Sequence, residues 1–270
     1  MTTALRDMRS LVERYPGLKA ALKTLLRPFR ADTSADYVEL GAGEREATAA
    51  SLKEAWRAAE IPQKQRGGVD RLLADYRAGN ACLQFDALVD MLRPLTLKVP
   101  RGERLTVLEV GCSSGYYSEV FAIKGLDVRY SGCDYSEAFV QMAQRIYPAL
   151  DFRVEDATAL RYPDASHDVV VSGCCLLHIA NYEAAIREAA RVARRYVVFH
   201  RTPVLHRRPT TYFTKRAYGV KTVEIHFNEL ELVASFARHG LYVIGITTLD
   251  TDWRAGDAYA TKSYLCEKAA

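Results

Sequence analysis

Two glycines that frame a short turn are the residues of this chain best suited to hold a ligand. The apolar run Val107–Val110 leads into Gly111, and Gly115 directly precedes an expected helix. Gly111 permits a tight turn, Gly115 lets a ligand approach the backbone, and the first amides of the helix face the same cleft. A dinucleotide-binding turn reads G-x-G-x-x-G, but Ser113 and Tyr116 stand at its second and third glycine positions. The pattern therefore argues against NAD, and the alternative is a turn that binds nothing.

A carboxylate ends the next expected strand. Asp134 closes the run 126–134, about twenty-five residues after Glu109, near the spacing of the acidic residue in dinucleotide-binding folds. At that place a carboxylate can accept hydrogen bonds from both hydroxyls of a ribose. The alternative is structural, because an aspartate followed by Ser136 also suits a turn and a helix cap.

The turn resembles the first motif of the class I S-adenosylmethionine-dependent methyltransferases, which reads (V/L)-L-(D/E)-x-G-x-G-x-G. Glu109, Gly111, Ser113 and Gly115 match this motif, with serine in place of the middle glycine. The resemblance covers residues 104–270. It implies an α/β fold, with a Rossmann-like, mostly parallel seven-stranded sheet and an antiparallel edge strand. It also implies S-adenosyl-L-methionine as the cofactor.

The same resemblance implies roles for residues that follow the later strands. Asp134 would hold the ribose of the cofactor, and Tyr135 would lie against its adenine. Asp156 and Ala157, just past the third strand, would contact the adenine and its exocyclic amine. Cys174, just past the fourth strand, completes the expected site.

Two histidines are candidates for a catalytic base. Methyl transfer from a sulfonium needs alignment, exclusion of water, and removal of a proton from an O–H or N–H acceptor. His178 lies in the pattern Leu177-His178-Ile179, which resembles a motif frequent in small-molecule members, and His200 ends the fifth strand. An acidic acceptor needs no protein base, so that alternative stays open. No N-P-P-(Y/F/W) motif is present, which counts against DNA adenine and protein glutamine as acceptors.

A basic segment follows the fifth strand. No acidic residue occurs between Arg191 and Val223, and residues 191–216 hold eight basic side chains, namely Arg191, Arg194, Arg195, Arg201, Arg207, Arg208, Lys215 and Arg216. Long connections in compact domains are usually functional or disordered. We expect a lid loop over about 201–225, in which Arg207 and Arg208 bind an anionic small-molecule acceptor. The alternative is a solvated basic loop.

Strands and helices alternate after Pro100, which predicts parallel crossover units. The expected strands are 104–110, 126–134, 151–156, 167–173 and 194–200. Two more strands, 241–249 and 259–267, have no helix between them and should pair antiparallel at the sheet edge.

Residues 1–100 are predicted to be a helical extension to a methyltransferase domain at 101–270. Its polar and aromatic residues include Trp56, Gln63, Gln65 and Tyr76. We expect this extension to cap the active site, and the alternative is a helical brace or a dimer contact. Whether the protein is a monomer or a homodimer stays open.

The composition of the 270 residues is that of a globular chain, since 49% are hydrophobic and 26% are charged. No apolar stretch is long enough to cross a membrane, and charges interrupt the first residues, so we expect a cytoplasmic protein. The six cysteines show no metal-binding spacing, and no metal is expected. A small-molecule O- or N-methyltransferase is favoured. One alternative is an RNA methyltransferase, favoured by the basic segment and the net charge of +4 but weakened by the absence of a recognisable RNA-binding module. The other is a non-catalytic binding protein.

Overall fold

A computed structural model describes residues 34–254 and 256–269 of the chain. The chain divides into two compact units, Met1–Ala35 and Asp36–Ala270, and almost all described elements belong to the second. Residues 1–33 of the predicted helical extension lie outside the described residues. Within the described ranges, the search for a helix long and apolar enough to cross a membrane finds none.

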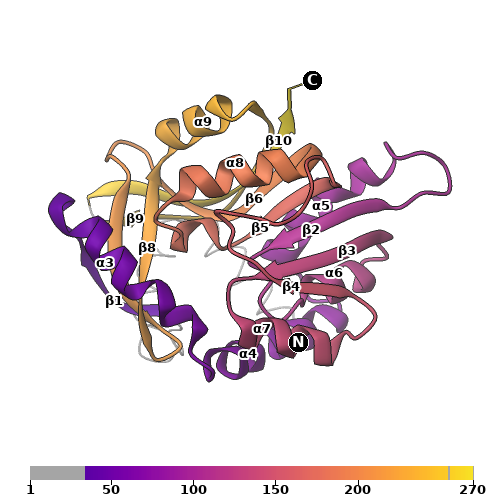
Figure 1. The fold of residues 1–270 in the computed structure, drawn as a ribbon, viewed down its shortest axis with the longest axis horizontal. Helices are drawn as coiled ribbons and strands as arrows, with labels where there is room; N and C mark the ends of the chain where they lie inside the picture. The colour runs from indigo at the N-terminus through magenta and orange to yellow at the C-terminus, as the bar shows by residue number, and fades with distance from the viewer. Residues whose placement is uncertain (1–33, 255, 270) are drawn as a thin grey trace, which may run out of the picture. The chain divides into compact units, whose positions relative to one another are not determined.

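Helices and strands alternate along most of the described chain (Figure 1). The helices, including short 3-10 helices labelled η, are η2 (Ala42–Glu44), α3 (Arg45–Leu52), η3 (Lys53–Arg57), α4 (Ile61–Arg77), α5 (Leu83–Thr96), α6 (Tyr117–Ile123), α7 (Glu137–Ile146), η4 (Leu176–His178), α8 (Tyr182–Val192) and α9 (Glu229–Arg238). The strands are β1 (Ser34–Glu39), β2 (Leu105–Val110), β3 (Val128–Asp134), β4 (Asp151–Val154), β5 (His167–Gly173), β6 (Ala193–Leu205), β7 (Thr211–Ala217), β8 (Val220–Asn228), β9 (Leu241–Arg254) and β10 (Asp257–Lys268).

Seven of these strands form the predicted Rossmann-like sheet. Strands β4, β3, β2, β5 and β6 are parallel neighbours in that order. β10 then pairs antiparallel with β6, and β9 pairs antiparallel with β10. The fold class is therefore confirmed, with the antiparallel strand β10 lying between β6 and the outermost strand β9.

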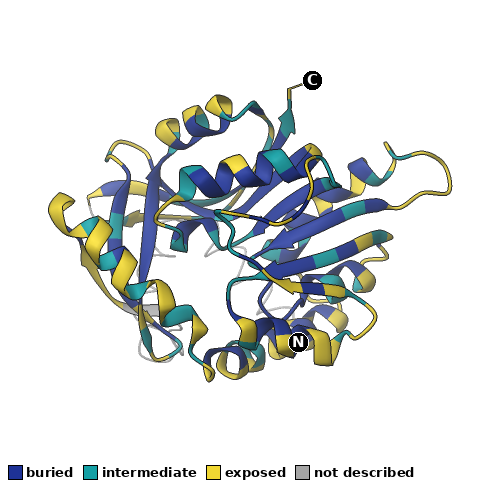
Figure 2. Ribbon diagram, in the orientation of Figure 1, coloured by how far each residue is buried: buried dark blue, intermediate teal, exposed yellow. Residues whose placement is uncertain are grey.

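Two apolar layers cover the two faces of this sheet. In β2, Leu105 and Val107 belong to one hydrophobic cluster, whereas Leu108 and Val110 belong to the other, as the two-residue period of a strand requires. The first cluster includes residues of α5, α6 and α7, and the second includes residues of α8 and α9. Figure 2 shows the central strands buried between these helices. The packing fixes the strand ends, where the candidate site residues lie.

The basic segment does not form the expected lid loop. Residues 211–217 and 220–228 are the strands β7 and β8, joined by a two-residue turn at Tyr218 and Gly219 with φ of +51° and +90°. Left-handed conformations at both central residues are typical of the hairpin turns that match the strand twist. The loop prediction was wrong because the segment is rich in threonine, valine and aromatic residues, which favour strands.

The hairpin extends the sheet past the end of β5. β6 runs on beyond its pairing with β5, and there Val204 and Leu205 pair with Phe227 and Asn228 of β8. β7 pairs with β8, and β1 lies at the outer edge. β1 departs from the prediction that residues 1–100 are helical. The other described parts of that stretch are helices or connections, and α3 and η3 lie against β8.

Candidate active site

The turn between β2 and α6 depends on its two glycines. Gly111 and Gly115 both have φ of +73°, a backbone conformation that residues with a side chain disfavour. A Cβ atom on Gly111 would collide with the side chain of Cys175, and one on Gly115 would lie 2.6 Å from Cζ of Phe152. The amide of Gly111 also donates to the carbonyl oxygen of Cys133 over 2.8 Å, which ties the turn to β3. Packing within the protein therefore requires both glycines. The sequence itself predicts that Gly111 permits the turn and that Gly115 lets a ligand approach the backbone.

Ser113 connects this turn to the carboxylate at the end of β3. Its backbone is left-handed as well, with φ of +54°, and its amide donates to Oδ2 of Asp134 over 2.8 Å. The amide of Ser136 donates to Oδ1 of Asp134 over 2.9 Å. The backbone of Tyr135 also interacts with this carboxylate, whose two oxygens together have about four lone-pair sites, so it can still accept from a further donor. Burial raises the pKa of Asp134 to about 6, because the hydrogen bonds from the amides offset only part of the desolvation.

The 3-10 helix η3 covers the aromatic residue that follows Asp134. The hydroxyl of Tyr135 donates to Oε1 of Glu54 over 2.6 Å, and the guanidinium carbon of Arg57 lies 3.9 Å from the centroid of the tyrosine ring. Nζ of Lys53 lies 5.0 Å from the same centroid and donates to Oδ2 of Asp156 over 2.9 Å. These three η3 residues were not predicted, since their charges suit any exposed helix.

Asp156 lies two residues past the end of β4, whose last residue Val154 pairs with Asp134, and it stays ionised at neutral pH. Its Oδ1 accepts hydrogen bonds from the amide and the hydroxyl of Thr158, over 2.9 and 2.7 Å. Burial acts to raise the pKa of Asp156, but the hydrogen bonds from Thr158 and Lys53 outweigh it and the pKa is lowered. Ala157 packs against the hydrophobic cluster on the α8 side of the sheet.

Glu109 lies in β2 with only 2% of its surface exposed. The hydroxyl of Tyr130 donates to its Oε2 over 2.5 Å, and a Cβ atom on Gly173 would collide with its Oε1. Burial raises the pKa of Glu109 to about 8, so the side chain is mostly protonated at neutral pH. The expected role of Glu109 in cofactor binding stays a prediction.

A sharp reversal at Cys174 follows β5. Cys174 has φ of +62°, and its amide donates to the carbonyl oxygens of Ser172 and His200 over 3.0 and 3.1 Å. The side chain is therefore held where β5 ends beside β6. Its neighbour Cys175 donates to the carbonyl oxygen of Val110 over 3.2 Å, and burial raises its pKa to about 12. Cys175 is thus a half-buried thiol that contacts the glycine turn.

His178 is neutral and packed against an aromatic ring. Its Nδ1 lies 2.7 Å from the carbonyl oxygen of Val223, so Nδ1 carries the proton and Nε2 keeps a lone pair. The ring of Trp56 lies against it, with 4.7 Å between the ring centroids. Burial, followed by the charge of Lys215, lowers the pKa of His178 to about 4. The pKa of His178 is therefore lower than expected, since the sequence predicts an imidazole that titrates near neutrality.

His200 is enclosed by hydrogen bonds. Its side chain is 1% exposed, with Nε2 2.7 Å from the hydroxyl of Tyr117 and Nδ1 2.8 Å from Oγ of Ser263. Burial, followed by the charge of Arg201, lowers the pKa of His200 to about 3. Neither ring nitrogen is left to receive a proton from an acceptor. The geometry contradicts the expectation that His200 is a base.

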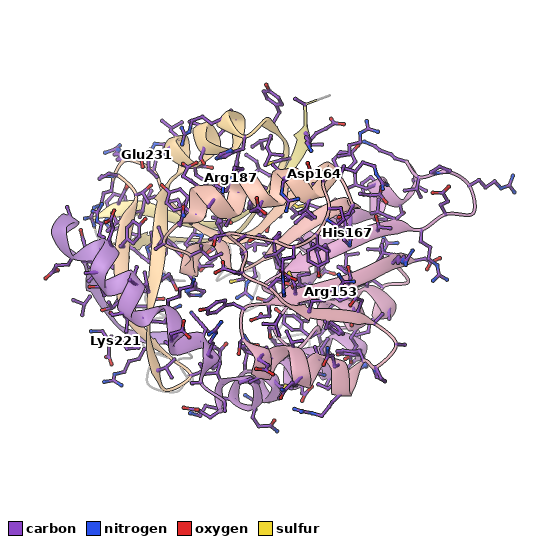
Figure 3. All side chains as sticks on the ribbon, viewed as in Figure 1. Arg153, Asp164, His167, Arg187, Lys221 and Glu231 are labelled. Carbon is purple, nitrogen blue, oxygen red and sulfur yellow. The ribbon has the colours of Figure 1, made fainter. Side chains whose placement is uncertain are left out.

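Most basic side chains of the segment 191–216 pair with carboxylates. Figure 3 shows Asp164 beside α8, where it pairs with Arg191 over 2.7 Å. The other pairs in this segment are Arg194 with Asp168, Arg195 with Glu267, Arg208 with Glu39, Lys215 with Glu224 and Arg216 with Asp36. The amides of Arg207 and Arg208 each donate to Oδ2 of Asp257 over 2.7 Å. The guanidinium of Arg208 is therefore already paired, whereas the side chain of Arg207 is exposed, and the expected binding of an anion by these two residues stays a prediction.

Two of the four polar and aromatic residues noted in the extension reach the site. Gln65 of α4 forms a hydrogen bond with the hydroxyl of Ser113, and Trp56 packs on His178. Tyr76 is buried and donates to Oδ1 of Asp86 over 2.6 Å, whereas Gln63 is exposed. Among the described residues, no cluster of three or more His, Cys, Asp or Glu side chains suits a metal ion.

Comparison with known proteins matches the segment that contains the turn and both strand-end aspartates. Residues 108–199 match the family described as "Methyltransferase domain". A probable S-adenosylmethionine-dependent methyltransferase of Mycolicibacterium smegmatis is 39% identical over 95 residues, which are 34% of this chain and 35% of that protein. The chain contains a class I S-adenosylmethionine-dependent methyltransferase domain.

Other relatives of this methyltransferase domain carry named activities. Ajmaline N-methyltransferase of Rauvolfia serpentina is 33% identical over 100 residues, which cover 35% of this chain and 34% of that protein. The 27-O-demethylrifamycin SV methyltransferase of Amycolatopsis mediterranei is 38% identical over 104 residues, which cover 36% and 37% of the two chains. The matches thus span about a third of the length of these relatives.

Solved methyltransferase structures share the fold over a larger part of the chain. The 1,6-didemethyltoxoflavin-N1-methyltransferase of Burkholderia thailandensis aligns with a TM-score of 0.55 and 15% identity, over 86% of this chain and 93% of that one. The magnesium protoporphyrin IX methyltransferase of Synechocystis PCC 6803 aligns with a TM-score of 0.50 and 17% identity, over 75% and 91%. At these identities the likeness shows the fold alone.

Proposed function

We propose that this chain transfers the methyl group of S-adenosyl-L-methionine to an oxygen or nitrogen atom of a small molecule. One observation carries the proposal: the glycine turn, Asp134 and Asp156 meet at the carboxyl ends of the neighbouring strands β2, β3 and β4. Open α/β sheets bind their ligands outside this edge. The matched relatives include one N-methyltransferase and one O-methyltransferase by name, which supports both atoms as targets.

The side chains at this edge fit the parts of the cofactor. Asp134 can accept a further hydrogen bond from the ribose hydroxyls, and the ionised Asp156 suits the exocyclic amine of adenine. Tyr135 and Ala157 supply apolar surface for the adenine ring. The backbone of Gly111, Ser113 and Gly115, with Glu109 beneath it, and Cys174 complete the proposed site. When bound, S-adenosylmethionine supplies a methyl group on a positively charged sulfur, so no acid is needed for the leaving group.

On the acceptor side, alignment contributes more than proton removal. Nε2 of His178 can receive the proton that the acceptor loses, but a group with a pKa of about 4 is a weak base at neutral pH. It is therefore suited to orient an acceptor that is acidic in its own right. Holding the two reactants in line lowers the barrier without strong acid–base catalysis.

The described part of the N-terminal extension is proposed to exclude water from this reaction. Lys53 and Arg57 contact Asp156 and Tyr135, and Gln65 contacts Ser113, so η3 and α4 lie directly on the cofactor residues. Closure of such a cover strengthens electrostatic interactions in the site and keeps the reactive sulfonium from water.

The two alternatives have less support. An RNA methyltransferase needs a surface of free cations, whereas six of the eight basic residues at 191–216 form ion pairs with carboxylates. A non-catalytic binding protein has no need for both strand-end aspartates in addition to the glycine turn.

Transfer of a labelled methyl group from S-adenosylmethionine tests the proposal. The purified chain is incubated with a panel of small phenols, amines and hydroxy acids, and separately with bulk RNA. We expect label in one class of small molecule and loss of that label with Asp134→Ala. Label in RNA supports the RNA methyltransferase, and cofactor binding without label in any acceptor supports the non-catalytic binding protein.

A further inference from the structure

β6 contains a bulge at the point where its pairing with β5 ends. Phe199 pairs with Tyr264 of β10 and Thr202 pairs with Lys262, so His200 and Arg201 together face the single residue Ser263. Arg201 is left-handed, with φ of +59°. A bulge of this kind redirects a side chain, and an arginine is an unfavourable residue for the left-handed region. Backbone strain of this kind is a pointer to function.

A buried polar chain holds the bulge in place. The amide of Arg201 donates to Oγ of Ser263 over 3.3 Å, and the same oxygen lies 2.8 Å from Nδ1 of His200. Nε2 of His200 lies 2.7 Å from the hydroxyl of Tyr117, the first residue of α6. Ser263 and His200 are 0% and 1% exposed. The position of Arg201 is therefore fixed by the same helix that follows the glycine turn.

The side chain of Arg201 is a cation among neutral groups. The groups whose charges act most strongly on its guanidinium are Cys174, Tyr116, Tyr117 and Tyr218. Among the described residues, no carboxylate forms an ion pair with its guanidinium, in contrast to the six basic residues of the same segment that do. The charge is permanent, because a guanidinium does not lose its proton in proteins.

We propose that Arg201 determines acceptor specificity by binding a carboxylate of the acceptor. The proposal rests on the proposed methyltransferase function and names the chemical class of its acceptor. A single guanidinium matches a single negative charge, and its planar fork binds a carboxylate through two parallel hydrogen bonds. A phosphate dianion would need further cations, and Arg208, Lys215 and Arg216 pair elsewhere.

The surrounding rings indicate that the acceptor is flat. Tyr116 and Tyr218 lie near Arg201, and Tyr218 packs near Trp56 with 6.3 Å between ring centroids. The indole Nε1 of Trp56 is buried and has no hydrogen-bond partner within the described part of the chain. An aromatic acid that carries a hydroxyl or amino group combines the anion, the flat ring and the methyl acceptor.

Calorimetry with matched acids and amides tests the role of Arg201. The protein is saturated with S-adenosylhomocysteine and titrated with 4-hydroxybenzoate, 4-aminobenzoate and the corresponding amides. We expect the wild-type chain to bind the acids at least tenfold more tightly than the amides. Arg201→Gln should abolish this preference, and Arg201→Lys, which keeps the charge without the fork, should restore part of it. Arg207→Gln, which removes a charge from an exposed side chain of the same segment, should bind like wild type.

Titration with S-adenosylhomocysteine alone shows whether Arg201 binds the carboxylate of the acceptor or the carboxylate of the cofactor. The affinity of Arg201→Gln for S-adenosylhomocysteine should stay within threefold of wild type, and its thermal unfolding should stay cooperative. A tenfold loss at this step would assign Arg201 to the carboxylate of the cofactor and overturn the proposal. Equal binding of acids and amides by the wild type would overturn it as well. If the wild type binds acids and amides equally but still binds S-adenosylhomocysteine, the proposed methyltransferase function is not contradicted.

Discussion

The protonation of Asp134 is expected to control the affinity for the cofactor in a pH range where few carboxylates titrate. Burial raises the pKa of Asp134 to about 6 in the unliganded protein, from an ordinary value of 3.8. The ribose hydroxyls are donors and favour the ionised carboxylate, so binding should tighten as the pH rises through 6. Lowering the pH should weaken it in the same range.

The magnitude follows from the fraction of Asp134 that is ionised. At pH 5, one unit below the raised pKa, about one molecule in ten carries the ionised carboxylate, so S-adenosylhomocysteine should bind roughly tenfold more weakly than at pH 7.5. This factor corresponds to about 1.4 kcal/mol. A carboxylate with an ordinary pKa would still be about nine-tenths ionised at pH 5 and would change the affinity by less than about 1.2-fold. Glu109, with a pKa of about 8, and His178, with a pKa of about 4, titrate outside this range.

Isothermal titration of S-adenosylhomocysteine from pH 5 to pH 7.5 measures the effect. Asp134→Asn is the matched control, since the amide has nearly the same shape and does not titrate. The variant should bind about 1.5–3 kcal/mol more weakly at pH 7.5, because it loses a charged acceptor, and its affinity should be nearly constant with pH. A wild-type affinity that stays constant to pH 5, or an equal pH dependence in Asp134→Asn, would show that the titration of Asp134 does not control cofactor binding.

Three further predictions concern the histidines and the glycine turn. His178→Gln should lower kcat by less than tenfold. The kcat of the wild type should show no acidic limb above about pH 5, because the pKa of His178 is about 4. A loss of a hundredfold or more, together with an acidic limb near pH 6.5, would instead identify His178 as the base. Tyr117→Phe should lower the free energy of unfolding in urea by about 1–3 kcal/mol, because Nε2 of the buried His200 loses its partner, and an unchanged stability would contradict that contact. Gly115→Ala should destabilise the protein by about 1–3 kcal/mol through strain at φ of +73° and the clash with Phe152. Phe152→Leu in the same chain should recover part of the Gly115→Ala loss, and no recovery would mean that the backbone strain dominates.

The parallel core of the fold and the turn residues could be predicted from the sequence because their signals are local. Apolar runs of period two, helices between them and the spacing of Gly111, Asp134 and Asp156 follow from short stretches of chain. The register of β2 against β3 then brings the turn to the end of the next strand without further information. Direct contact of Glu109 with the cofactor was inferred from the motif and stays untested.

The covering elements could not be predicted because they depend on contacts between distant segments. Nothing in the sequence around Lys53 indicates its hydrogen bond to Asp156, about a hundred residues away. The hairpin was missed for a related reason, since its charge suggested a loop while the ion pairs with Glu39, Glu224 and Asp36 neutralise it. The burial of His200 is likewise set by Ser263, which reaches it only through the pairing of β10 with β6.

The structure of the protein in complex with S-adenosylhomocysteine tests the central claim most directly. We expect the ligand to lie at the carboxyl ends of β2, β3 and β4, with its ribose hydroxyls on Asp134, its adenine against Tyr135 and its exocyclic amine near Asp156. A ligand bound elsewhere, or a ribose that makes no hydrogen bond to Asp134, would contradict the claim.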